Sequence, residues 1–341
     1  MTMTRVSNTG WGVNGELAQR VRGAHATEID SLIQYEIFSG AAEGKSQSTI
    51  DLTVLTLKTL KRFLQRNSLP LDLNVLGPQE LRSFILDLQG SKRYEQHRFT
   101  RRQETQLSRQ TVNAYLRAIR AAWNRWVSDG LVESSPFQQL KIPRVQRKVI
   151  PTFTPAQLKD LLAAVDTSTP EGFRDHLLIL MYLDTAGRLS EITNLRICHV
   201  DMKLRCIKVL GKGQRERVVP IGAKVQKLLW KYINMYRPEP ITSRYDQVFL
   251  TGDGRPLSKN RVEEIMHKYG KKAGITGVRC SPHTLRHTAC LMWVREGGDI
   301  FVLQQITGHS SLEVLRGYVN LAQSDVSQAH RKYSPVDNLE I

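Results

Sequence analysis

Residues 281–287 read SPHTLRH. Proline suits the first turn of a helix, and three- and four-residue spacing places His283, Arg286 and His287 on one face of that helix. Single helical histidines usually cap, pack or face solvent, so the combination matters more than any one of them. The two histidines also have the spacing of a zinc helix, but Thr284 stands where such a helix carries its glutamate, and no third ligand lies nearby. We therefore expect no metal here.

Residues 303–311 read LQQITGHSS. Gly308 is placed to end a helix, which would present His309 just beyond it. Tyr318 follows nine residues after His309. A lone tyrosine is most often half-buried structure, but here it closes a segment that already carries two other imidazoles and a guanidinium. The segment 281–318 thus supplies hydrogen-bond donors first and a phenol last.

Two upstream segments make this cluster specific. Residues 185–191 read TAGRLSE, which places Arg188 after a glycine turn at the start of a helix. Residues 211–217 read GKGQRER, which places Lys212 at the tip of a β-hairpin. With these segments the chain resembles the tyrosine recombinases, the phage-integrase type of site-specific DNA recombinase.

The resemblance covers residues 150–335 by motif, in the family's order and spacing. One departure is local: the family commonly has Thr-Gly-x-Arg, whereas here Ala186 precedes Gly187, so the glycine is shifted by one place. The family's catalytic positions are matched at Arg188, Lys212, His283, Arg286, His309 and Tyr318.

The resemblance implies a mainly α fold with a small β-hairpin or sheet, in which an N-terminal helical core-binding domain precedes a C-terminal tyrosine-recombinase catalytic domain. A chain of 341 residues suits two domains. We predict a loose segment at 1–25, a helical DNA-clamping domain at 26–140, a basic linker at 141–152, a catalytic domain at 153–320 and a tail at 321–341. The tail either folds back on its own subunit or, as the resemblance implies, docks on a neighbouring one.

The charge of the chain predicts a polyanionic partner. Lys and Arg number 49 against 32 Asp and Glu, a net charge of +17, and each phosphate neutralised by a cation releases condensed counterions. Double-stranded DNA is therefore favoured over a small acidic ligand. No apolar run approaches the roughly 18 residues that span a bilayer, no lipidation signal is present, and residues 1–17 lack a secretory apolar core. The four cysteines form no C-x-x-C pair, so we expect reduced thiols in a cytoplasmic protein without membrane contact.

Apolar periodicity predicts three helices in the first domain, at 46–66, 78–88 and 108–127. Aromatic residues in the third helix keep core spacing, so they indicate packing rather than base stacking. On its other faces four arginines are expected to be free for phosphate contact: Arg109, Arg117, Arg120 and Arg125.

Residues 91–106 and the linker at 141–148 carry further positive charge, and Pro143 stiffens the linker. Such charge runs are often solvated loops, but in a DNA-gripping protein they are candidates for phosphate contact. The predicted DNA-binding residues are Lys92, Arg93, Arg98, Arg101, Arg102, Arg109, Arg117, Arg144 and Lys148.

The second domain begins at residues 154–157, TPAQ, a capping box with proline at the first helical position. Strands at 207–209 and 217–221 flank the GKG turn. A G-x-G alone is a weak sign of a nucleotide-binding loop, and no strand–helix unit follows it, so we expect no nucleotide cofactor. Further helices are predicted at 155–165, 172–183, from 188 onward, at 223–236 and at 259–270.

The chemistry of these residue types points to phosphodiester transfer. A phosphodiester attacked by an alkoxide develops charge on its non-bridging oxygens, which planar guanidiniums such as Arg188 and Arg286 stabilise. Tyr318 can attack in line and form a phosphotyrosyl ester that conserves the bond for rejoining.

A free phenol has a pKa of about 10, so a base or positive field must help it ionise. We assign that role to His283. Lys212, on its hairpin, would protonate the leaving 5′ oxygen, as the resemblance also implies. His309 would hydrogen-bond the scissile phosphate, while Glu191 and His287 support the site. No cofactor is required.

The predicted function is a site-specific recombinase that cuts and rejoins DNA through a 3′-phosphotyrosine, as a homo-tetramer on paired duplexes, to integrate, excise or transpose a mobile element. Two alternatives stay open. One is a type IB topoisomerase-like enzyme that relaxes DNA, and the other is a catalytically silent DNA-binding accessory protein.

Overall fold

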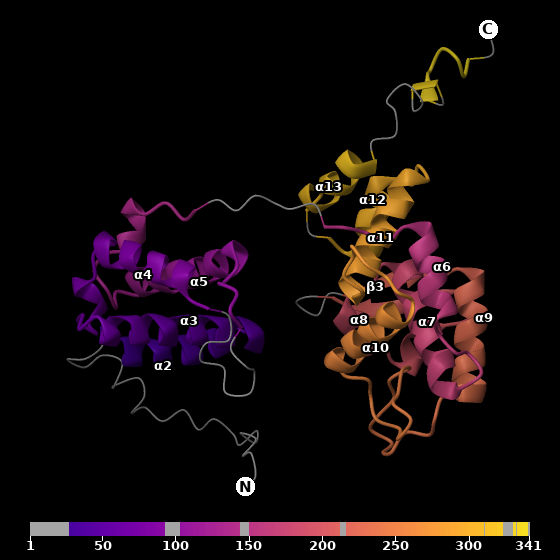
Figure 1. Cartoon of the computed structure of the whole chain (residues 1–341), viewed down its shortest axis with the longest axis horizontal. Coiled ribbons are helices and arrows are strands. Elements are labelled where there is room, and N and C mark those ends of the chain that lie inside the picture. The colour runs from indigo at the N-terminus through magenta and orange to yellow at the C-terminus, as the bar shows by residue number, and fades with distance from the viewer. Residues whose placement is uncertain are drawn as a thin grey trace. The chain divides into compact units, whose positions relative to one another are not determined.

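The computed structural model describes residues 27–92, 103–143, 150–211, 216–309, 311–322, 330–331 and 333–339. The chain forms two compact units, Met1–Arg147 and Lys148–Ile341 (Figure 1). Each has its own hydrophobic core. The roles predicted for the individual segments, including the linker and the tail, stay predictions.

The described part of the first unit is mainly helical. The three predicted helices are confirmed as α3, α4 and α5, and most of the apolar residues that predicted them are buried, with Leu57, Leu60, Trp123 and Trp126 fully enclosed. Ser108 caps α5, because its side chain accepts a hydrogen bond from the Thr111 amide at 3.1 Å. The elements are α2 (Ile29–Ala42), α3 (Gln47–Arg66), η1 (Leu73–Val75), α4 (Pro78–Gly90), α5 (Arg109–Ser128) and η2 (Pro136–Gln139).

Helix α2 was not predicted, because its buried face is not purely apolar: Glu36 and Gly40 share it with three aliphatic side chains. Glu36 is 4% exposed and accepts a hydrogen bond from Nη1 of Arg125 at 2.7 Å. The expectation that Arg125 is free for DNA is therefore wrong. A buried carboxylate needs a partner, and Arg125 supplies it.

The second unit is mostly helical around one small sheet, so the predicted fold class is confirmed. The antiparallel sheet has the order β1-β2-β3, and Val209 pairs with Arg217 across β2 and β3. The two-residue strand β1 was missed because it is too short to show alternation. The elements are α6 (Pro155–Ala163), α7 (Pro170–Thr185), α8 (Leu189–Thr193), η3 (Ile197–His199), β1 (Val200–Asp201), β2 (Cys206–Leu210), β3 (Glu216–Pro220), α9 (Ala223–Lys231), η5 (Tyr232–Tyr236), α10 (Lys259–Lys272), α11 (Pro282–Arg295), α12 (Ile300–Thr307) and α13 (Glu313–Ala322).

Local signals set several of these boundaries. The Thr154 hydroxyl accepts from the Gln157 amide at 3.2 Å while the Gln157 side chain accepts from the Thr154 amide at 3.0 Å, which is the predicted capping box. Gly308 ends α12 in the left-handed region at φ 62°. The helix predicted to run to Tyr236 differs at its end, because its last five residues form a π-helix, η5.

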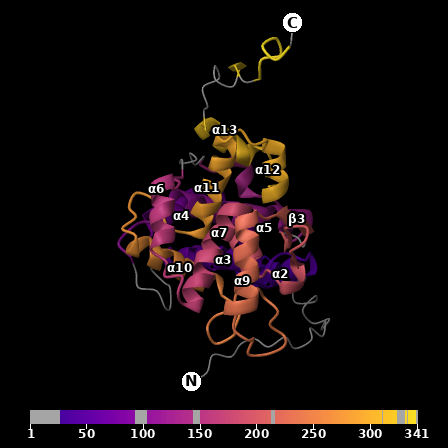
Figure 2. The ribbon, with the colours of Figure 1, turned by 90° about the vertical axis from the view of Figure 1, so that its right-hand side faces the viewer.

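Helix α11 lies at the centre of the site. It packs against α7 and α13, while α12 packs against β3. Figures 1 and 2 show α11, α12 and α13 gathered at one end of the second unit. Among the described helices, none is long and apolar enough to cross a bilayer.

Candidate active site

Two guanidiniums converge on consecutive carbonyls where α12 ends. Arg188 donates from Nη2 to the Gly308 carbonyl at 2.6 Å, and Arg286 donates from Nη2 to the Thr307 carbonyl at 3.0 Å. Arg286 is 5% exposed, whereas the Arg188 side chain is 32% exposed. These two arginines were predicted from separate motifs. They lie close together because both bind carbonyls at the C-terminal end of α12.

The turn before Arg188 shows the consequence of the displaced glycine of the TAGR motif. Ala186 takes the left-handed conformation, with φ 46° and ψ 32°, at the place where the family pattern has glycine. Its carbonyl accepts a hydrogen bond from Nη1 of Arg286 at 2.7 Å. The strain of a left-handed alanine, roughly 1–2 kcal/mol, is offset in part by burial of its methyl group beside Cys290 and Tyr318.

Gly187→Ala is expected to destabilise the second unit by about 1–3 kcal/mol, because overpacking a buried site costs that much. A Cβ at position 187 would lie 2.7 Å from Cδ1 of Ile192, which is fully buried. The matched control is Ala186→Gly, where relief of strain and loss of the buried methyl oppose each other. Denaturant unfolding of both variants checks this, and equal stability of Gly187→Ala and wild type would contradict it.

The buried Glu191 and the partly buried Arg217 form an ion pair next to Arg188. Arg217 donates from Nη1 and Nη2 to the two carboxylate oxygens of Glu191, each at 2.7 Å, and from Nε to the Ile306 carbonyl at 2.9 Å. Glu191 also accepts from Nη1 of Arg188 at 2.7 Å. Burial alone raises the pKa of Glu191, but the hydrogen bonds from Arg217 and Arg188 outweigh it and lower that pKa to about 2.

Arg217 was not among the predicted site residues. A signal was present, since Arg217 shares the parity of the buried Val219 along β3, and a charge on the inward face of a strand needs a partner. The partner, 26 positions away in the chain, was not visible in the sequence. Through Glu191 and Ile306, Arg217 joins β3, α8 and α12 around Arg188.

His309 is held from both ring nitrogens. Its Nε2 lies 2.8 Å from Nη2 of Arg286, which can only donate, so Nε2 accepts. The proton is then on Nδ1, which lies 2.9 Å from the Thr307 hydroxyl. Burial first, and then the charges of Arg286 and Arg188, lower the pKa of His309 to about 4. A neutral imidazole therefore faces the two guanidiniums at neutral pH.

Tyr318 is 5% exposed and packs with Cys290, Leu303 and Leu315. Its hydroxyl contacts Nδ1 of His287. The predicted base, His283, does not contact the phenol, because His287 lies between them. Burial, more than any other influence, raises the pKa of Tyr318.

Acid is expected to destabilise the second unit between about pH 6.5 and pH 4. Burial and then the charges of His283 and Arg286 lower the pKa of His287 from 6.5 to about 4, and His309 shifts by the same amount. The unfolded chain thus binds more protons than the folded chain in that window, so stability falls as the pH falls. Thermal unfolding from pH 7 to 4.5 measures this, with His287→Gln giving a flatter dependence than the exposed control His267→Gln. The same slope in His287→Gln as in wild type would contradict the assignment.

Of the predicted DNA-binding residues, three lie in the described part of the chain. Lys92 forms an ion pair with Glu104, while Arg109 and Arg117 are exposed on α5. The other six predicted DNA-binding residues lie outside the described residues: Arg93, Arg98, Arg101, Arg102, Arg144 and Lys148. The predicted catalytic residue Lys212 also lies outside them.

Comparisons with known proteins agree with the fold and identify the family. The model of the phage integrase family matches residues 151–325. The tyrosine recombinase XerC of Oceanobacillus iheyensis is 32% identical over 69% of this chain and 78% of its own length. XerD of Xanthomonas axonopodis pv. citri is 30% identical over 64% of this chain and 74% of its own length.

Solved structures show the same fold. A XerH site-specific recombinase bound to a difH substrate aligns with a TM-score of 0.68 at 19% identity, covering 89% of this chain and 85% of that one. A lambda integrase dimer on a core site aligns with a TM-score of 0.64 at 14% identity, covering 83% of this chain and 96% of that one. The chain belongs to the tyrosine recombinase family, whose members are enzymes that cleave and rejoin DNA strands.

Proposed function

We propose that Tyr318 attacks a DNA phosphodiester and forms a 3′-phosphotyrosyl intermediate, which a second DNA strand then resolves. The observation that supports this is the placement of Tyr318, His309 and the Arg188–Arg286 pair on elements packed around α11. The guanidiniums would exchange their hydrogen bonds to backbone carbonyls for bonds to the non-bridging oxygens of the phosphate.

The remaining roles complete one reaction cycle. His309 would donate to the same phosphate after rotating its proton-bearing nitrogen toward it. Lys212, which follows β2 and precedes β3 in the sequence, would supply the proton that the leaving 5′ oxygen needs. Glu191 and Arg217 would hold Arg188 in place, since Glu191 accepts from both arginines. This chemistry balances without a nucleotide or a metal ion.

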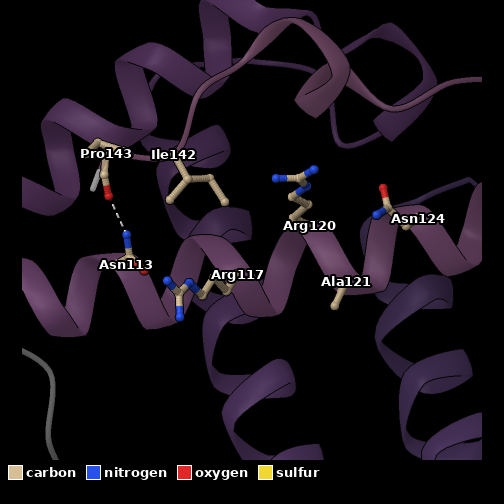
Figure 3. A pocket seen from close by; sticks show the side chains of 7 residues that line it. All are labelled: Asn113, Arg117, Arg120, Ala121, Asn124, Ile142 and Pro143. Carbon is tan, nitrogen blue, oxygen red and sulfur yellow. Dashed lines mark hydrogen bonds between the residues drawn. The ribbon is translucent and has the colours of Figure 1, made fainter. Parts of the chain in front are cut away.

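The first unit is proposed to hold the duplex along α5. Figure 3 shows Arg117, Arg120 and Asn124 along α5. These residues line a pocket of about 470 Å³. These three side chains are exposed, and Arg and Asn are the side chains that pair best with guanine and adenine edges. Asn113 is committed elsewhere, because its amide donates to the Pro143 carbonyl at 2.6 Å.

Arg117→Ala and Arg120→Ala are each expected to weaken DNA binding. Each should also reduce the slope of log K for DNA against log salt concentration by about one. A loss confined to one DNA sequence would indicate base contact, whereas a uniform loss would indicate phosphate contact. The matched control is Arg82→Ala, an exposed arginine on α4 with the same change of charge. If wild type and all three variants had the same salt dependence, a DNA-binding role for this face of α5 would be contradicted.

We propose that the reaction integrates, excises or transposes a mobile element. The likeness in fold to a Tn1549 transposon integrase supports this direction. The curated relatives XerC and XerD, at 30–32% identity, favour a second candidate, recombination between paired sites in chromosome dimer resolution. An integration assay separates the two candidates. The DNA that flanks the gene is supplied as a linear donor, together with a plasmid that lacks this sequence. Integration of the donor into the plasmid supports movement of a mobile element and not chromosome dimer resolution.

The active form is proposed to be a homo-tetramer on two duplexes, as in the lambda integrase tetramer bound to a Holliday junction. The segment after residue 320 would dock on a neighbouring subunit. Truncation after residue 320 should then preserve DNA binding and abolish higher-order complexes in gel shifts.

One experiment separates the proposed enzyme from its alternatives. The protein is incubated with a supercoiled plasmid that carries two copies of the DNA sequence to which the protein binds. Recombined products support the proposal, relaxed plasmid alone supports a topoisomerase-like enzyme, and bound but intact DNA supports an accessory protein.

A further inference from the structure

A path of hydrogen bonds runs from the phenol of Tyr318 through two imidazoles. The Tyr318 hydroxyl contacts Nδ1 of His287. The opposite nitrogen of that ring, Nε2, lies 2.8 Å from Nε2 of His283. Tyr318 is buried, His287 is partly buried and His283 is exposed. The path therefore connects the buried phenol with the protein surface.

The hydrogen bonds of this path have one consistent assignment of donors and acceptors. A phenol is a stronger acid than the N–H of a neutral imidazole, so Tyr318 donates and Nδ1 of His287 accepts. The proton of His287 is then on Nε2, which donates to Nε2 of His283. Each hydrogen bond in the path has one donor and one acceptor.

We propose that His287 takes the phenolic proton of Tyr318 as that oxygen attacks DNA, and that His283 carries the proton onward to solvent. This inference rests on the proposed function, which names Tyr318 as the nucleophile. The O–H bond breaks as the Nδ1–H bond forms on His287. The Oη–P bond forms as the P–O5′ bond breaks, and the leaving oxygen takes its proton from a separate acid, Lys212.

Burial and charge keep His287 ready to accept a proton. Burial and then the charges of His283 and Arg286 lower its pKa to about 4, so its ring is neutral at pH 7. His309 is the further titratable group that senses its charge. A bound phosphodiester would neutralise Arg286 and remove one cause of the low pKa. His287 would then become a stronger base when DNA enters the site.

The position of the base also follows from the packing of the phenol. Tyr318 is held in a small apolar cluster with Cys290, Leu291 and Leu315. Burial raises the pKa of Tyr318, so the phenol does not ionise unaided. Since the imidazole of His287 touches the hydroxyl directly, the proton need cross only one hydrogen bond.

The test measures covalent adduct formation in a single turnover. Its substrate is a nicked duplex whose sequence the full-length Tyr318→Phe protein selects from a random library. His287→Asn keeps an acceptor near the position of Nδ1 but takes up no proton. We expect this variant to form adduct about 10²–10⁴ times more slowly, with unchanged DNA affinity and thermal midpoint. His283→Asn should lose less, because the contact between Tyr318 and His287 remains.

A second substrate separates the base from the acid. It carries sulfur in place of the bridging 5′ oxygen, and a thiolate leaves without needing a proton. Lys212→Ala should recover on this substrate, whereas His287→Asn should stay slow. A merely structural role for His287 would slow both substrates and also lower the thermal midpoint.

Three results would overturn the proposal. His287→Asn could form adduct at the wild-type rate, or it could regain that rate on the sulfur substrate. His283→Asn could also lose more of the rate of adduct formation than His287→Asn does. A measurement without any change at position 287 guards against misfolding. The ¹⁵N spectrum of the imidazoles should shift at Nδ1 of His287 between wild type and Tyr318→Phe, and a shift confined to His283 would also refute it. If wild type forms no adduct on any selected duplex, the proposed function itself fails.

Discussion

Tyr318→Phe is expected to abolish the covalent protein–DNA adduct while leaving DNA affinity unchanged. Only a hydroxyl is lost, and the ring keeps its place in the cluster with Leu303 and Leu315. Phenylalanine has no oxygen that can bond to phosphorus, so no adduct should be visible on a nicked substrate that traps wild type. Denaturing electrophoresis of the reaction separates the adduct from free protein.

Tyr333→Phe is the control for this experiment. Tyr333 is 60% exposed and is not part of the buried cluster that holds Tyr318, so its loss should leave adduct formation intact. Adduct in Tyr318→Phe would show that Tyr318 is not the nucleophile, and Tyr333 would be the next candidate.

Arg286→Lys and Arg188→Lys are expected to lower the rate of strand cleavage by roughly 10²–10³ each, the cost of one lost contact in the transition state. Each change keeps the positive charge but removes a planar fork that donates to two acceptors. Arg286 uses that fork to hold the Ala186 and Thr307 carbonyls, so its loss should also loosen the turn before Arg188.

The measurement is single-turnover cleavage with enzyme in excess, at one fixed salt concentration, because electrostatic binding would otherwise mask the effect. Arg261→Lys on α10 is the matched control, since that side chain is 57% exposed and pairs with Glu264. Near-normal cleavage by both Lys variants would refute the placement of the two arginines at the phosphate.

Local features of the fold could be predicted because they depend on neighbours within a turn or two. The apolar stripe of α3, the capping box at Thr154 and the glycine at position 308 each act over a few residues. Helix α2 could not be predicted in this way, since its buried Glu36 is compensated by Arg125, 89 positions along the chain.

The same distinction holds within the site. Three- and four-residue spacing placed His283, Arg286 and His287 on one helical turn, and chain order placed a phenol after them. The pairing of Glu191 with Arg217 was missed, because it depends on how β3 lies against α8 and not on either sequence segment alone.

The sequence by itself determined which chemical groups this protein carries, in what order, and which of them share a turn of α11. Only the tertiary structure decided which of them meet. Tyr318 and His287 are 31 positions apart, and the rotation of α13 against α11 directs the phenol to His287 instead of His283. The physical reason is that backbone hydrogen bonds and caps act locally, whereas contacts between helices follow from the burial of apolar faces contributed by distant segments.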